Sequence, residues 1–328
     1  MSQQELTFLQ IGLGSMGKRR IRNLLAAGEK KIIGLDVSPE RRREAQEQFG
    51  IQAVETLEAV PVREFDAMLI STPPNAHGDY IRFALKHRKH FYTEVATTDD
   101  GYADIFSAEP GLVMAPSSTF LHFLPIKMMQ DFVKSGRIGA VKLFQYHVGQ
   151  YLPTFHPWED YRRSYISKKE TGSCRTLFLF ELLWLNRLVG STPALVTGMM
   201  GKVSDLEMTA DDTLSASLLY DNGVRGSLLI ELLSRKPVRY LNLVGSEGVL
   251  EWDWLGSLIR IHDAQGNTDV VPVSQGNPAS GYLAAEEMYD AEIKSFVEAI
   301  RGVAPYPVTF KEDLENLRML RAFEKGTP

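Results

Sequence analysis

The residues Gly12-Leu13-Gly14-Ser15-Met16-Gly17 decide the fold of the first third of the chain. They follow an apolar run at 6–11 and precede an amphipathic stretch at 15–27. In such a strand–turn–helix unit the first glycine permits a tight turn, the second lets a pyrophosphate approach the backbone, and the third lets helix and strand pack closely. The positive end of the helix dipole then faces the phosphates. The pattern predicts a dinucleotide-binding turn in which the three glycines, Ser15 and Met16 contact the cofactor.

An acidic residue, Asp36, ends the next apolar run about 20 residues after the turn. A carboxylate at this place accepts hydrogen bonds from the ribose hydroxyls of the adenosine and opposes a 2′-phosphate. We therefore expect NAD as the cofactor rather than NADP. Arg41, Arg42 and Arg43 follow closely. They are either partners for a phosphate or the exposed face of a surface helix, and we favour the second interpretation.

Short apolar runs alternate with amphipathic stretches through residue 115 or so. The expected strands are 6–11, 31–36, 51–54, 65–71, 90–94 and 112–115, and the expected helices are 15–27, 39–49 and 75–87. This alternation predicts an α/β Rossmann fold with a doubly wound parallel sheet, because helices cover both faces of such a sheet.

Two further polar segments lie at carboxyl ends of these strands, the edge at which open α/β sheets bind ligands. The first is the loop Ser71–His77 and the second is Glu94. The residues predicted there to bind the cofactor are Ser71, Thr72, Pro73, Asn75, His77 and Glu94. Asn75 is equally suited to cap the following helix, and His77 is equally suited to face solvent.

The second part of the chain has several apolar stretches between 141 and 262, with the hairpin signal Asp221-Asn222-Gly223 between two of them. They predict an α+β domain with an open, mostly antiparallel sheet that carries helices on one face. We expect two domains, a nucleotide-binding domain at 1–120 and a substrate-binding and oligomerisation domain at 121–328.

Composition excludes several classes of protein. The chain has 328 residues, a net charge of -5 and 44% hydrophobic residues, so it is neither disordered nor a general nucleic-acid binder. No uninterrupted apolar run reaches the length of a membrane span, and the start does not resemble a signal peptide. Cys174 is the single cysteine, which excludes an internal disulfide, and no histidine spacing suggests a metal site. We expect a cytoplasmic protein without a metal.

These motifs resemble the glucose–fructose oxidoreductase/inositol dehydrogenase family, known as Gfo/Idh/MocA. The resemblance rests on the glycine turn, Asp36, the Ser71–His77 loop and Glu94, and continues through Ser135–Val141 to the helix around 289–296. It implies NAD(P) on a Rossmann domain and oxidation or reduction of sugars, polyols or related compounds. It also implies a homodimer or homotetramer formed through the sheet of the second domain.

The chain departs from the family pattern where proton transfer normally occurs. The family sequence Glu-Lys-Pro is replaced by Glu94-Val95-Ala96. The aspartate and histidine that the family often carries on a later helix are replaced by Thr176 and Phe180. A common arginine falls on His122. The resemblance therefore implies that both usual proton-transfer groups are absent.

Other residues must then supply the acid/base group that oxidation of an alcohol normally needs. The candidates for catalysis are His122, Glu181 and Glu94. His122 follows the last expected strand of the first domain and is equally suited to cap the next helix. Glu181 lies in an apolar helix, where a carboxylate needs a cation or a ligand hydroxyl as partner. A structural ion pair is the alternative for Glu181.

The segment 151–165 mixes aromatic, basic and acidic residues, a composition suited to sugars. It resembles a segment of family members from bacterial surface-sugar biosynthesis. The alternative is a loop that clamps a domain or subunit interface. The residues predicted to bind substrate are His122, Trp158, Tyr161, Arg162, Tyr165, Arg175 and Glu181.

The resulting hypothesis is an NAD(H)-dependent oxidoreductase of a sugar or sugar derivative, with surface-carbohydrate biosynthesis as the suggested setting. Two alternatives remain open. One is a non-catalytic NAD-dependent sensor or scaffold, suggested by the loss of lysine at 95 and histidine at 180. The other is an epimerase or lyase that oxidises its substrate transiently.

Overall fold

The computed structural model describes residues 5–155, 159–277 and 285–326. The chain forms two compact units, Met1–Ser118 with Tyr289–Leu314, and Thr119–Met288 with Glu315–Pro328. The first break lies close to the predicted boundary at 120. The assignment of all of 121–328 to a second domain differs from these units, because the segment from Tyr289 returns to the first one.

The return of this segment has a physical cause in the first core. The helix α7 (Glu286–Ile300) presents Ile293, Phe296 and Val297, which are buried in the same apolar cluster as Phe8 and Tyr92 of the sheet. Without them, one side of that core would face water.

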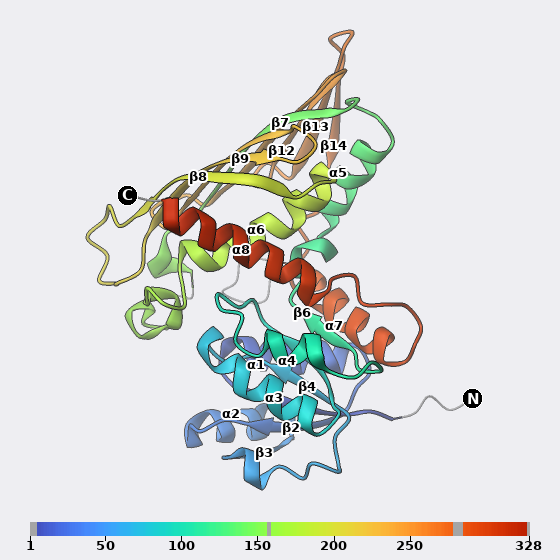
Figure 1. The fold of residues 1–328 in the computed structure, drawn as a ribbon, viewed down its shortest axis with the longest axis vertical. Coiled ribbons are helices and arrows are strands. Elements are labelled where there is room, and N and C mark those ends of the chain that lie inside the picture. Colours follow the sequence, from blue (N-terminus) through green and yellow to red (C-terminus); the bar gives the residue numbers. More distant parts are fainter. Residues whose placement is uncertain (1–4, 156–158, 278–284, 327–328) are drawn as a thin grey trace. The chain divides into compact units, whose positions relative to one another are not determined.

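The first unit is built on a six-stranded parallel sheet with the order β3-β2-β1-β4-β5-β6 (Figure 1). The strands are β1 (Thr7–Ile11), β2 (Lys31–Leu35), β3 (Gln52–Val54), β4 (Ala67–Ile70), β5 (His90–Thr93) and β6 (Met114–Pro116). The order reverses at β1, which lies between β2 and β4. The predicted Rossmann fold is therefore confirmed, and its ligand-binding edge is the carboxyl end of β1 and its neighbours.

The helices of this unit include α1 (Ser15–Ala26), α2 (Pro39–Phe49), α3 (His77–Lys86) and α4 (Tyr102–Ser107). Ala76, not Asn75, precedes α3 as its N-cap, and no side chain caps that helix. The alternative role of Asn75 as a helix cap is therefore wrong. The last helix, α8 (Phe310–Gly326), begins in the first unit and ends in the second.

The second unit contains an eight-stranded sheet with the order β14-β13-β12-β11-β7-β10-β9-β8. The strands are β7 (Val141–Gly149), β8 (Pro193–Gly201), β9 (Thr213–Tyr220), β10 (Arg225–Glu231), β11 (Val238–Gly245), β12 (Gly248–Asp253), β13 (Leu258–Asp263) and β14 (Thr268–Pro272). All neighbours are antiparallel except β7 and β10. The predicted open, mostly antiparallel sheet is thus confirmed.

Two helices, α5 (Leu124–Lys134) and α6 (Cys174–Val189), cover one face of this sheet (Figure 1). Tyr146 of β7 lies 5.1 Å from Trp184 of α6, measured between ring centroids. Cys174 is buried at the start of α6, and its burial raises the pKa of the thiol. The single cysteine is thus an apolar packing residue.

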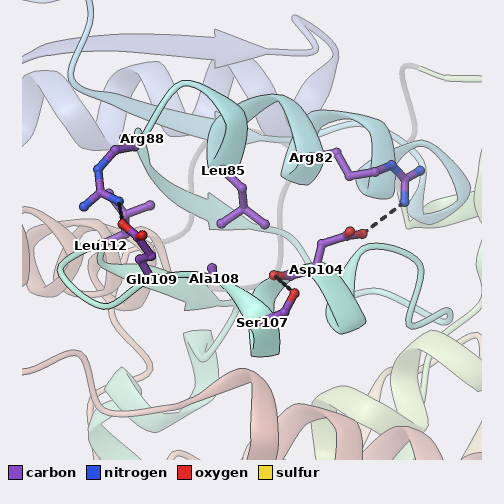
Figure 2. A pocket seen from close by; sticks show the side chains of 8 residues that line it. All are labelled: Arg82, Leu85, Arg88, Asp104, Ser107, Ala108, Glu109 and Leu112. Atoms are coloured by element: carbon purple, nitrogen blue, oxygen red, sulfur yellow. Dashed lines mark hydrogen bonds and ion pairs between the residues drawn. The ribbon is translucent and has the colours of Figure 1, made fainter.

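A cavity of about 430 Å³ lies on the first unit between α3 and α4 (Figure 2). Its charged side chains are paired, Arg82 with Asp104 at 3.6 Å and Arg88 with Glu109 at 3.0 Å. None of the predicted site residues lines it, so this cavity is a groove between two surface helices.

The start of α8 is sensitive to pH. Tyr102 of α4 donates a hydrogen bond to the carboxyl group of Asp313, and burial raises the pKa of Asp313 from 3.8 to about 6. An acid with a raised pKa stabilises the fold when protonated, so this contribution is complete below about pH 4 and is lost as the pH rises through 6.

We expect Asp313→Asn to remove this loss, because the amide cannot ionise. Relative to the variant, the wild type should lose on the order of 2 kcal/mol of unfolding free energy between pH 4 and pH 7. Urea denaturation of both proteins across that range measures the difference. A difference that does not change with pH would contradict the prediction.

Candidate functional site

The glycine turn has the geometry that a dinucleotide requires. Gly12 has a φ of +82°, and a Cβ there would lie 2.5 Å from the carbonyl oxygen of Ser71. A Cβ at Gly17 would overlap the carbonyl oxygen of Gly12. Only glycine fits at these two positions, and the close packing sets the start of α1 against the ends of β1 and β4.

Gly14 differs from Gly12 and Gly17, because a Cβ at Gly14 would meet no backbone atom within 4 Å. The nearest atoms to a Cβ there belong to the Arg41 guanidinium, at 3.8 Å. Gly14 is also the N-cap of α1 and has no side chain to bond the first N–H groups of the helix. An open space beside the helix N-terminus is where a pyrophosphate binds. The turn therefore fits NAD.

Asp36 lies at the carboxyl end of β2 and is buried. One carboxylate oxygen accepts a hydrogen bond from the Leu13 N–H at 2.8 Å, and the other accepts one from the Ser38 N–H at 2.8 Å. Each oxygen keeps a second lone pair, which suits it to a ribose hydroxyl. Asp36 thus holds the turn and can hold the adenosine.

The three arginines that follow Asp36 do not share one role. Arg42 donates to the Asp36 and Val37 carbonyls and pairs with Glu55, and the Arg43 guanidinium lies near Glu47 at the surface. Arg41 lies beside Gly14, 3.8 Å from the Asp36 carboxylate. The interpretation of all three as a solvated helix face therefore fits Arg43. The Arg42 side chain is only 17% exposed, and Arg41 borders the candidate cofactor site.

A contact between its own buried histidine and a backbone carbonyl stabilises the Ser71–His77 loop. His77 is 2% exposed, and its Nε2 lies 2.9 Å from the Thr72 carbonyl oxygen. Burial lowers the pKa of His77 to about 4, so the ring is neutral at physiological pH. His77 is therefore not a solvated side chain. The Thr72 hydroxyl is buried and has no hydrogen-bond partner within the described part of the chain, as expected of a group that binds a ligand.

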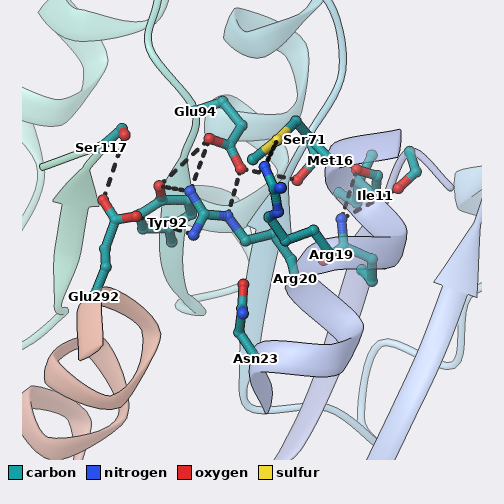
Figure 3. Close-up of polar contacts among 12 residues, drawn as sticks. Ile11, Met16, Arg19, Arg20, Asn23, Ser71, Tyr92, Glu94, Ser117 and Glu292 are labelled. Carbon is teal, nitrogen blue, oxygen red and sulfur yellow. Dashed lines mark hydrogen bonds and ion pairs between the residues drawn. The ribbon is translucent and has the colours of Figure 1, made fainter. Parts of the chain in front are cut away.

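Glu94 is fixed by a residue that the sequence did not reveal. Arg20 of α1 is fully buried, and its guanidinium donates to both Glu94 oxygens at 2.6 and 2.9 Å (Figure 3). Its third nitrogen, Nη1, pairs with Glu292 of α7 at 2.9 Å, and Nη2, which donates to Glu94, also donates to the Tyr92 hydroxyl. The signal was the spacing of Arg20 three residues after Gly17, which places it on the inner face of the helix.

Glu181 is fully buried in the second unit. Its carboxylate accepts hydrogen bonds from the Tyr146 hydroxyl at 2.9 Å and the Trp184 indole at 2.7 Å, and pairs with Arg239 at 2.9 Å. The expected cation is therefore present, but it comes from β11. Arg175, on the same helix, is not the partner of Glu181.

Arg175 points elsewhere because it is six positions from Glu181 on α6, about 240° around the helix. Its guanidinium pairs with Glu324 of α8 at 2.5 Å and donates to the carbonyls of Lys169 and Glu170 at 3.1 Å. It holds the start of α6 to α8 within the second unit.

His122 lies in a short 3-10 turn, Thr119–His122, that packs against α6. Phe120 of this turn contacts Phe180 with ring centroids 5.8 Å apart, and the Arg239 guanidinium lies over the Phe120 ring at 4.5 Å. The residue at the family histidine position is thus part of an aromatic contact that holds the turn of His122.

The predicted substrate segment is partly occupied by its own contacts. Arg162 pairs with Asp160 at 2.8 Å and Glu207 at 3.3 Å, and the Tyr161 hydroxyl accepts from the Glu207 N–H. Tyr165 is exposed. Trp158 lies outside the described residues.

Metal-binding groups and membrane-spanning helices are both absent from the residues that the structure describes. Among them, no three His, Cys, Asp or Glu side chains are grouped to hold a metal ion. Among them also, no helix has the length and apolar character needed to cross a membrane.

Comparison with known families agrees with this geometry. Residues 6–97 match the model of an oxidoreductase family with an NAD-binding Rossmann fold, and residues 126–251 match the Gfo/Idh/MocA C-terminal domain. The chain belongs to the Gfo/Idh/MocA family. It is therefore an NAD(P)-dependent oxidoreductase with NAD as the cofactor of its Rossmann unit.

Individual relatives are distant. The chain is 25% identical over 279 residues to dTDP-3,4-didehydro-2,6-dideoxy-alpha-D-glucose 3-reductase of Streptomyces violaceoruber, covering 80% of this chain and 75% of the relative. An oxidoreductase from Agrobacterium radiobacter, solved with NAD+, L-tartaric acid and magnesium, has a TM-score of 0.86 at 17% identity and covers 98% and 96% of the two chains. The WlbA dehydrogenase from Bordetella pertussis, solved with NADH and UDP-GlcNAcA, has a TM-score of 0.79 at 18% identity and covers 98% and 96%. These structures share the fold.

The open space at Gly14 gives a direct test of cofactor binding. We expect Gly14→Val to fold normally, because nothing lies within 3.8 Å of the new Cβ, but to weaken NADH binding by about tenfold or more, because the side chain fills the place of the phosphates. Fluorescence titration with NADH measures the affinity and thermal unfolding measures the fold. As a contrast, Gly17→Val should destabilise the protein itself. Unchanged NADH affinity in the Gly14 variant would contradict the assignment.

Proposed function

We propose that this chain catalyses NAD(H)-dependent oxidation or reduction of a sugar or sugar derivative, with surface-carbohydrate biosynthesis as its setting. The observation that carries the proposal is an intact dinucleotide turn in a chain similar along 80% of its length to a deoxysugar 3-reductase. When bound, the nicotinamide cofactor supplies the hydride acceptor or donor. In this proposal Glu94, which is held by Arg20 and Ser71, orients the cofactor or the substrate at the carboxyl end of β5.

The proposed proton carrier is His122. Val95 and Phe180 have no titratable group, and the buried Glu181 carboxylate is already bound by Tyr146, Trp184 and Arg239. His122 is the titratable residue on the turn that contacts Phe180 through Phe120. In this proposal Glu181 positions Arg239 and Tyr146, while Tyr165 and Arg162 offer an aromatic face and a guanidinium to the substrate.

A non-catalytic NAD-dependent sensor is the second candidate. The observation that favours it is the apolar pair Phe120–Phe180, which includes the position at which the family resemblance implies a histidine. A sensor would bind NAD tightly and turn over no substrate.

A panel of free, phosphorylated and nucleotide-linked sugars and keto-sugars separates the two candidates. We expect cofactor-dependent turnover of at least one, followed by the absorbance of NADH. His122→Asn should lower kcat by about 100-fold or more while NADH affinity is kept, because loss of a general acid or base costs this much. His87→Gln, at the end of α3, is the matched control and should keep full activity. Tight NAD binding without turnover across the panel would favour the sensor.

Substitutions at position 95 test whether the absence of the family lysine limits the reaction. Val95→Lys should confer measurable polyol oxidation, because an amine at this place can accept the proton of the reacting hydroxyl. Val95→Met, of similar length but without a proton-transfer group, is the control. If the two variants behave alike, pocket shape rather than the missing lysine limits the reaction.

The open face of the large sheet is proposed as the contact between identical subunits. Register places six exposed apolar side chains on that face: Leu143, Leu195, Met199, Leu229, Tyr240 and Val270. A patch of this kind is typical of a protein interface. The proposed assembly is a homodimer or homotetramer.

Charge substitution on this face tests the assembly. The double variant Met199→Asp/Leu229→Asp should be monomeric by light scattering, because two carboxylates would be buried in the contact. Val303→Asp, an exposed residue of the first unit, is the control and should leave the assembly intact. A monomeric wild type would refute the proposed contact.

A further inference from the structure

Gln10 is a polar side chain inside the core of the first unit. It is fully buried in β1, between Leu9 and Ile11, which are fully buried as well. Its amide nitrogen donates to two backbone carbonyls, that of Ile11 at 3.1 Å and that of Gly12 at 3.2 Å. Its amide oxygen is buried and has no hydrogen-bond partner among the residues that the structure describes. A buried oxygen without a partner costs stability, and an apolar side chain of similar length would avoid that cost.

The Ile11 carbonyl determines which way the Gln10 amide points. That carbonyl also accepts a hydrogen bond from the N–H of Ser71, which follows β4, at 2.8 Å, so it is fixed within the sheet. Only the nitrogen of the amide can face a carbonyl oxygen, because two acceptors repel each other. The side chain therefore presents its N–H groups, and not its oxygen, to the neighbouring Gly12 carbonyl.

The peptide between Gly12 and Leu13 is thereby held at both of its polar groups. Its carbonyl oxygen accepts from Gln10 on one side, and its N–H donates to the Asp36 carboxylate at 2.8 Å on the other. A glycine backbone has no Cβ to restrict rotation of this peptide. In the rotated form the carbonyl would face the Asp36 carboxylate and the N–H would face the Gln10 amide nitrogen, so both contacts would be repulsive. Gln10 and Asp36 thus favour the same orientation.

The third glycine of the turn provides the room that Gln10 needs. A Cβ at Gly17 would lie 3.3 Å from the Gln10 amide nitrogen and would overlap the Gly12 carbonyl oxygen. The bare backbone of Gly17 therefore lets the amide, the carbonyl and the first turn of α1 pack together. The same turn carries the open space beside Gly14, where a pyrophosphate binds.

We propose that Gln10 is a positioning residue of the nucleotide site, which holds the Gly12–Leu13 peptide in the orientation that binds NAD. Because Gln10 is fully buried, it acts through this peptide and not by touching the cofactor. A turn that is fixed in advance does not have to be ordered on binding, and it keeps the Asp36 carboxylate in place for the ribose. The apparent affinity falls with the fraction of molecules that keep the competent orientation. Loss of one such hydrogen bond corresponds to about a tenfold change in that fraction.

Gln10→Met tests this role, because the thioether fills the space of the amide but donates no hydrogen bond. The Kd for NADH, measured by isothermal titration calorimetry, should rise by about tenfold. The urea midpoint of the cofactor-free protein should not fall, because removal of the unpartnered oxygen offsets the lost hydrogen bond. A structural role alone would lower this midpoint instead. Leu9→Met is the matched control, because it places the same side chain on the opposite face of the same strand, and it should keep the Kd of the wild type.

Gln10→Glu separates the hydrogen bond from the shape of the side chain. The protonated form of the new carboxyl group donates to the Gly12 carbonyl, whereas the ionised form can only accept and repels that oxygen. With the wild type measured at the same pH as reference, the Kd for NADH should be unchanged at about pH 5 and raised about tenfold or more at about pH 9. The proposal is overturned if Gln10→Met binds NADH as tightly as the wild type, or if Gln10→Glu at the lower pH binds as weakly as Gln10→Met.

Discussion

Burial of the Arg20 guanidinium is the constraint on which the first unit depends. A guanidinium keeps its proton in proteins, so carboxylates inside the fold have to match its charge. One of them, Glu94, comes from the end of β5, and the other, Glu292, comes from a helix that follows the whole second unit in sequence. A single side chain therefore ties together the helix of the glycine turn, the carboxyl edge of the sheet and the returning helix α7.

The features set by local sequence could be predicted, and those set by distant partners could not. The glycine turn, Asp36 and the alternating strands follow from spacing and periodicity alone. The burial of Ile293, Phe296 and Val297 in the core of the first unit does not follow from them. An apolar helix face fits either core, and periodicity does not indicate which of the two cores it joins. Arg20 belongs to a basic run that resembles a solvated helix face. Its spacing from Gly17 indicates the inner face of α1, but the carboxylate partners that balance its buried charge come from distant segments.

The same limit applies to the candidate site. Sequence could show that Glu181 needs a cation, because an apolar helix does not tolerate a lone carboxylate. It could not name Arg239, whose β11 strand pairs with β7 across more than 80 residues of chain. The substitutions at Val95 and Phe180 were visible at once. Their structural consequence was not visible. Phe180 contacts Phe120, and the Arg239 guanidinium lies over the Phe120 ring, because α6 packs against the turn before α5.

The discontinuous first unit also has a consequence for biosynthesis. β1 to β6 leave the ribosome early, but Glu292 and Phe296 follow only after Thr119–Met288 of the second unit have been translated. Until then Arg20 lacks one of its counter-charges and the core lacks one wall. Closing a loop of roughly 170 residues costs little more entropy than closing a shorter one, since the cost grows with the logarithm of length. The nucleotide site is therefore completed only after α7 has been translated, and a nascent chain without α7 has no completed site with which to sequester the cofactor.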